Sequence, residues 1–127
     1  MILLDTHIVL ASLGQIDLSL PQSIQSKLRE RNSASVSVVS IWEIAIKFRL
    51  GKLILNISIA DVPEFLERQN LMVLPIQSQH TFADIGPEPI TKDPFDRLLL
   101  GVCASERLKL LTLDDKLVDH PLAWRKN

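Results

Sequence analysis

The sequence predicts an α/β fold in which a mainly parallel sheet of four to five strands lies between two layers of helices. Short apolar segments alternate with segments of helical periodicity along the chain, which is typical of successive βαβ units. These apolar segments are continuous instead of alternating with polar residues, as expected for strands covered on both faces. The length of 127 residues fits a single domain over 1–127.

The composition narrows the class of protein further. Hydrophobic residues make up 46% of the chain and charged residues 23%, a balance typical of a folded core and too apolar for disorder. The net charge of −1 provides no overall basic field, so nucleic-acid binding would need a local patch. A single cysteine excludes a disulfide within the chain and favours the cytoplasm. No uncharged apolar stretch approaches the ~18 residues of a membrane span, and Asp5 interrupts the first one, which argues against a signal peptide.

The expected elements follow one another with short connections. Strands are expected at residues 2–4, 34–39, 71–76 and 109–113. Helices are expected at residues 6–14, 21–31, 40–51, 59–69, 78–86, 95–108 and 114–120. Pro21 suits the first turn of its helix, and Gly14 and Gly51 suit the left-handed position that ends one. Three prolines in eight residues predict a loop over 87–94.

Acidic residues recur where the expected strands end. Asp5 directly follows the first strand, and Asp114 directly follows the fourth. Glu43 lies in the first turn of the helix expected after the second strand, and Asp96 in the first turn after the proline loop. In a parallel α/β sheet the carboxyl ends of the strands meet at one edge, where such folds place their ligands. We therefore expect Asp5, Glu43 and Asp114 to lie together there, joined by Asp96 if its helix begins at the same edge.

Each acid also has a structural explanation. Ser40 as N-cap, with Glu43 three residues later, matches a capping box. Asp93 would cap a helix whose first residue is Pro94, with Asp96 in the first turn. The two remaining acids would each cap the segment that follows them. The helix dipole stabilises a carboxylate at such positions by ~0.3–1 kcal/mol.

A cluster of these acids would need more than capping to explain it. Two carboxylates ~4 Å apart repel each other by roughly 4 kcal/mol at an effective dielectric constant near 20. Such a cluster must protonate, spread apart or hold a cation. Ligands that are all oxygen suit Mg²⁺ or Mn²⁺, one or two ions, and the matching chemistry is metal-assisted phosphodiester hydrolysis.

Four segments carry a family resemblance. In order, "LLDTH", "SVVSIWEIAIK", "DPFDRLLLG" and "LLTLDD" resemble the PIN-domain family, and more closely the VapC-type ribonuclease toxins of bacterial type II toxin–antitoxin systems. The resemblance implies a PIN-like α/β/α fold, a metal-dependent endoribonuclease, a homodimer and a cognate antitoxin. Its catalytic and metal-binding acids correspond to Asp5, Glu43, Asp96 and Asp114. Supporting hydroxyls correspond to Thr6 and Thr112, with Ser40 added as pocket support.

Several other residues are weaker candidates. RNA phosphates could meet basic side chains close to the four acids, namely Lys47, Lys92, Arg97 and Lys116. For each of these alone, a solvated surface charge or an ion pair within a helix is the simpler interpretation. His7 could contact substrate, although a locally hydrogen-bonded histidine is the simpler interpretation. Trp42 is expected to pack or to support a subunit contact in preference to stacking on a base.

The sequence also allows two other functions. A phosphatase or phosphoacceptor domain of the haloacid-dehalogenase or receiver type also begins with a strand that ends in Asp. The dehalogenase pattern requires a second Asp two residues later, where this chain has His7, and the receiver pattern requires adjacent acids and a late lysine that are not evident. A non-catalytic binding module, whose acids only cap helices, predicts no stabilisation by divalent cations.

Overall fold

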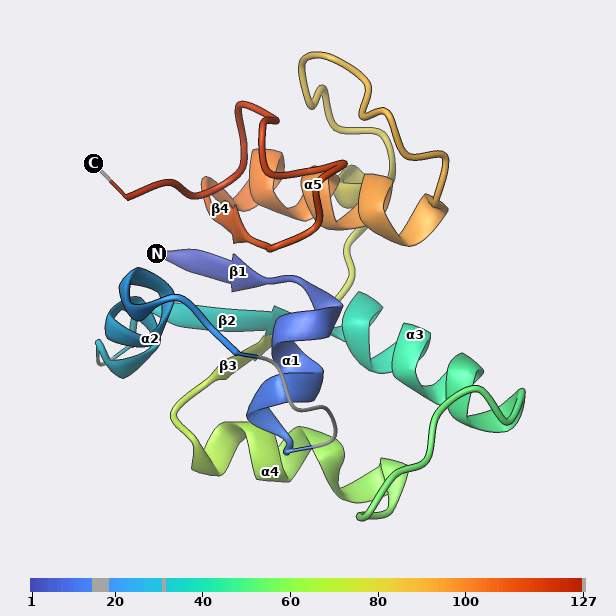
Figure 1. Ribbon diagram of the computed structural model, residues 1–127. Helices are drawn as coiled ribbons and strands as arrows, with labels where there is room; N and C mark the ends of the chain where they lie inside the picture. The colour runs from blue at the N-terminus through green and yellow to red at the C-terminus, as the bar shows by residue number, and fades with distance from the viewer. Residues whose placement is uncertain (15–18, 31, 127) are drawn as a thin grey trace.

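A computed structural model describes residues 1–14, 19–30 and 32–126 (Figure 1). Four strands form one sheet in the order β3-β2-β1-β4, and each neighbouring pair is parallel. The strands are β1 (Ile2–Leu4), β2 (Ala34–Ser37), β3 (Met72–Leu74) and β4 (Lys109–Leu111). The predicted parallel sheet is therefore confirmed.

Helices cover both faces of this sheet. The α-helices are α1 (Thr6–Ser12), α2 (Gln22–Arg29), α3 (Val38–Arg49), α4 (Val62–Arg68) and α5 (Pro94–Glu106). Two short 3₁₀ helices, η1 (Ile59–Asp61) and η2 (Ser78–Thr81), precede α4 and α5. Figure 1 shows α5 on one side of the sheet and α1 and α4 on the other. This three-layer α/β/α arrangement confirms the predicted fold class.

The first strand explains why two layers are needed. Successive strand residues point to opposite faces, and all three residues of β1 are fully or almost fully buried. Ile2 and Leu4 belong to the apolar core shared with α1, α2 and α4. Leu3 belongs to the second core, which is built around α5 and includes Leu110 of β4. A strand that is apolar on both sides can be buried only between two helical layers.

The second strand is shorter than predicted, which moves the start of α3. The strand ends at Ser37, and α3 begins at Val38. The Ser37 hydroxyl accepts a hydrogen bond from the Val39 N–H at 3.0 Å, so Ser37 is the N-cap. The predicted capping box of Ser40 and Glu43 is wrong, and both residues lie inside the helix. Val38 and Val39 favour a strand by propensity. A helix can bury Val39 against the α5 layer as well as a strand can, so this propensity does not decide the boundary.

Other boundaries also differ from the predictions. The strands predicted at 71–76 and 109–113 each have three residues, the helix at 59–69 starts as a 3₁₀ turn, and the one at 78–86 is only the four residues of η2. Pro21 is the N-cap of α2, and Arg31, the last residue of that predicted helix, lies outside the described residues. The helix predicted at 114–120 is wrong, because this segment forms successive turns. The chain then runs beside β4 and forms a parallel bridge between Leu110 and Ala123.

The features predicted around α5 are confirmed. Residues 87–93 have no regular structure, and α5 begins at Pro94. The Asp93 carboxylate accepts a hydrogen bond from the Phe95 N–H at 2.9 Å and caps the helix.

Gly14 and Gly51 have φ angles of 72° and 73°, the left-handed conformation expected after a helix. Within the described residues, the structure has no helix with the length and apolar character needed to cross a membrane.

Candidate active site at the carboxyl edge of the sheet

Asp5 lies between the ends of β1 and β4 and is almost completely buried. Its Oδ1 accepts a hydrogen bond from the Thr6 N–H at 2.8 Å, which makes Asp5 the N-cap of α1. Its Oδ2 accepts a hydrogen bond from the Thr112 hydroxyl at 2.6 Å. That hydroxyl in turn accepts one from the Asp114 N–H at 3.0 Å, which leaves its single proton for Asp5. Thr112 therefore connects Asp5 to Asp114.

Glu43 is the second buried acid, with 7% of its surface exposed. Its Oε1 accepts a hydrogen bond from the Thr6 hydroxyl at 2.7 Å, and the same hydroxyl lies 3.0 Å from Ser40 Oγ. Its Oε2 lies 2.8 Å from the ammonium group of Lys47, one turn further along α3. These contacts tie the acid on α3 to the residue that directly follows Asp5.

Asp96 lies in the first turn of α5, half-buried. Burial is the main cause that raises the pKa of its carboxyl group, to about 7. The negative charges of Asp93, Asp5 and Asp114 also raise this pKa, whereas a hydrogen bond with Thr91 lowers it. Because these charges act on Asp96, α5 begins at the same edge of the sheet as Asp5 and Asp114. That position was the condition on which Asp96 would join the other acids.

The pKa of Asp5 is also raised above its ordinary value. Burial is the main cause, and the charge of Glu43 adds a smaller effect in the same direction. The hydrogen bonds from Thr112 and Thr6 and the nearby His7 lower the pKa and partly compensate. The acids thus influence one another in pairs, Asp5 with Glu43 and Asp96 with both Asp5 and Asp114.

The chain also matches a known protein family. The PIN-domain family matches residues 2–121, which is nearly the whole chain. The chain is a PIN domain. PIN domains are generally nucleases that act on nucleic acids, and they usually use divalent metal ions. No curated protein gave a significant match to this chain.

The donor chemistry of this PIN domain fits a hard cation. All four acids offer carboxylate oxygens, and the raised pKa values of Asp5 and Asp96 show that negative charge is unfavourable here. Among the described residues, no three His, Cys, Asp or Glu side chains converge as a ready-made metal site. Mg²⁺ usually keeps several waters and takes only one or two carboxylates, so such convergence is not required for this ion.

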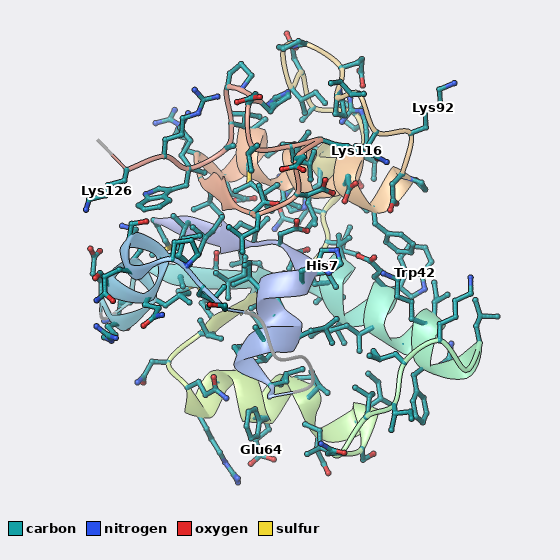
Figure 2. All side chains as sticks on the ribbon, viewed as in Figure 1. His7, Trp42, Glu64, Lys92, Lys116 and Lys126 are labelled. Atoms are coloured by element: carbon teal, nitrogen blue, oxygen red, sulfur yellow. The ribbon has the colours of Figure 1, made fainter. Side chains whose placement is uncertain are left out.

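The four basic candidates of the PIN domain lie in different surroundings. Lys47 is paired with Glu43 and is the one that contacts an acid of the site through its ammonium group. Lys92 and Lys116 are exposed (Figure 2), and the Lys116 N–H donates to Asp114 Oδ1 at 2.9 Å. The Arg97 guanidinium donates to the Ala83 carbonyl at 3.1 Å and lies 3.6 Å from Glu88. Arg97 therefore contacts the loop before α5.

Sequence reasoning missed two contributors to the site. Thr91 forms a hydrogen bond with Asp96, and its hydroxyl accepts the Asp93 N–H at 3.1 Å. The sequence predicts Asp93 only as a cap, yet its charge also raises the pKa of Asp96. A signal for Thr91 was present, because a threonine stands two residues before Asp93 just as Thr112 stands two residues before Asp114.

Proposed function

We propose that this PIN domain is a metal-dependent endoribonuclease that hydrolyses RNA phosphodiester bonds. Asp5, Glu43, Asp96 and Asp114 would bind one or two Mg²⁺ or Mn²⁺ ions. The observation that carries the proposal is the gathering of acids at one edge of the sheet, where Thr112 links Asp5 to Asp114 and Thr6 contacts Glu43. Burial and the charges of neighbouring aspartates also raise the pKa of Asp96 to about 7. A divalent cation would remove the mutual repulsion of these carboxylates. In a nuclease fold, such an ion would act on a phosphodiester substrate.

The chain's own residues prepare the site for this reaction. Thr112 and the Thr6 N–H hold both oxygens of Asp5, so the carboxylate has a fixed orientation. The Thr6 hydroxyl and Lys47 do the same for Glu43. When bound, the metal would polarise the phosphate, activate water and offset charge on the leaving oxygen. Lys47 is placed to exchange its contact with Glu43 for one with a substrate phosphate.

A role as the VapC-type toxin of a type II toxin–antitoxin pair is part of this proposal. It rests on the four sequence segments, and it includes a cognate antitoxin, a homodimer and action on cytoplasmic RNA. Exposed apolar side chains at and beyond the end of α3 suit a protein partner: Phe48, Leu50 and Ile54 are 44%, 62% and 84% exposed. A non-catalytic PIN-like module remains the alternative, and the phosphatase alternative lacks the second Asp at the position of His7.

The test is cleavage of a mixed pool of small RNAs by the purified protein. Reactions contain Mg²⁺, Mn²⁺ or EDTA. Asp96→Asn is compared with Asp115→Asn as control, because Asp115 is an exposed acid next to Asp114. We expect cutting that requires the metal, disappears in Asp96→Asn and persists in Asp115→Asn. Cutting that survives EDTA and Asp96→Asn would show a contaminant or another mechanism.

A melting experiment decides the case in which no RNA is cut. Binding of Mn²⁺ to the folded protein raises its melting temperature, and Asp5→Asn should abolish this increase. If Mn²⁺ leaves the melting temperature of the wild-type protein unchanged, the nuclease proposal is wrong and the acids only cap helices.

A further inference from the structure

An exposed tryptophan stands beside the acidic site. Trp42 is 51% exposed, although an indole ring is among the largest apolar groups a protein can bury. Its ring meets Phe95 edge to face, with centroids 5.2 Å apart and planes at 67°. Figure 2 shows Trp42 projecting from the first half of α3 on the side of α5. Phe95 therefore contacts the ring while about half of the surface of Trp42 remains open to solvent.

The aromatic pair is linked directly to two of the acids. Trp42 precedes Glu43 on α3, and Phe95 precedes Asp96 on α5. The contact between the rings thus joins the two helices at the level of the acids. A substrate whose phosphate lay at the acids would have its neighbouring bases within reach of this ring.

An exposed cation lies on the same face of α3 as Trp42. Arg49 lies seven residues after Trp42, so both project from the same face of α3, about 10 Å apart along the axis. The Arg49 side chain is exposed. An aromatic ring with a cation beside it is the combination by which proteins bind single-stranded nucleic acid, with the ring stacking on a base and the cation meeting the backbone.

We propose that Trp42 stacks on an unpaired base of the RNA substrate next to the bond that is cut. The proposal rests on the proposed function and adds a residue that selects single-stranded RNA. Stacking tolerates every base because each base has a π face, so Trp42 favours unpaired segments over duplexes without reading sequence. Phe95 positions the ring, since it contacts the indole edge to face.

The test is binding of short RNA followed by tryptophan fluorescence. The chain has two tryptophans, so Trp124→Phe leaves Trp42 as the reporter. The probes are a mixed-sequence single-stranded RNA decamer and a ribose-phosphate chain of equal length and charge without bases. Titrations are made in EDTA and again in Ca²⁺. Ca²⁺ replaces Mg²⁺ because its coordination is more flexible and differs from that of Mg²⁺. We expect the decamer, and not the abasic chain, to quench Trp42.

Variants separate stacking from packing. Because these variants lack the Trp42 reporter, their affinity is measured beside wild type from the anisotropy of a dye-labelled decamer. Trp42→Leu keeps an apolar side chain without a π face and should weaken decamer binding roughly 5- to 150-fold, the range found for loss of one stacked base. Trp42→Phe should retain most of the affinity. The slope of affinity against salt should stay the same in both, because no phosphate contact is removed. Phe82→Ala is the matched control, since Phe82 is an exposed aromatic (73%) beyond η2 and should not affect binding.

Three results would overturn the inference. One is equal affinity of wild type and Trp42→Leu, and another is equal quenching by the abasic chain. The third is Trp42 emission that depends on protein concentration and resists iodide quenching without RNA, which would show that a second copy of the chain covers the ring. If the wild type cuts RNA with metal yet shows any of these results, only the stacking role fails. If it neither binds nor cuts RNA, the proposed function fails with it.

Discussion

Replacement of Asp96 by Asn should stabilise the metal-free protein. The pKa of this carboxyl group rises from an ordinary value of 3.8 to about 7 in the folded protein, mainly through burial and the charge of Asp93. At pH 8 the folded protein therefore holds mostly a carboxylate in a place where ionisation is unfavourable. Asparagine has nearly the same shape and no charge, so the substitution removes this penalty.

The size of the effect follows from the pKa. A rise from 3.8 to about 7 corresponds at full value to about 4 kcal/mol of unfavourable ionisation. Because Asp96 is only half-buried, solvent screening reduces the expected effect to about 1–2 kcal/mol. Between pH 4 and 7 the folded protein binds more protons at this group than the unfolded chain does, so wild-type stability falls as pH rises through this window. Below pH 4 the group is protonated in both states and contributes nothing.

The measurement is urea denaturation in EDTA at pH 4.5 and at pH 8. Asp96→Asn should be about 1–2 kcal/mol more stable than wild type at pH 8, with little difference at pH 4.5. Asp115→Asn, which changes the exposed acid next to Asp114, should show no such dependence of its stability on pH. Added Mn²⁺ should stabilise the wild type and not Asp96→Asn. The reasoning is refuted if Asp96→Asn is no more stable than wild type at pH 8, or if its advantage is the same at both pH values.

Two further substitutions test contacts that support the site. Thr112→Val removes the donor to Asp5 Oδ2 and should lower the free energy of unfolding, measured with urea, by about 1–3 kcal/mol. Thr112→Ser keeps the hydroxyl and should lower it little. Equal stability of the two variants would show that the hydroxyl is unimportant. Gly101→Ala places a Cβ against the backbone carbonyl of His80, which should destabilise the fold by about 1–3 kcal/mol. The higher helix propensity of alanine should offset up to ~1 kcal/mol of this loss. A Gly101→Ala variant more stable than wild type would show that η2 can move away from α5 freely.

The start of α5 shows what local sequence signals can determine. Asp93 followed by Pro94 predicts a helix start, and the structure has its N-cap and first residue at these positions. Such signals act within one turn, through a side chain that accepts a nearby N–H and a ring that restricts φ. The end of β2 shows the converse. Ser37 and Ser40 are both candidate N-caps, and burial of Val39 against the α5 layer is satisfied with Ser37 as the N-cap.

The sequence by itself determined the parallel α/β architecture and the places where acids follow strands, because periodicity and charge are properties of a single segment. Only the tertiary structure decided how the acids are connected. The hydrogen bond from Thr6 to Glu43 joins residues 37 positions apart, and that from Thr112 to Asp5 joins residues 107 apart. The pKa of Asp96 likewise depends on burial and on charges from other segments. Such contacts arise from packing between elements, which no local pattern encodes.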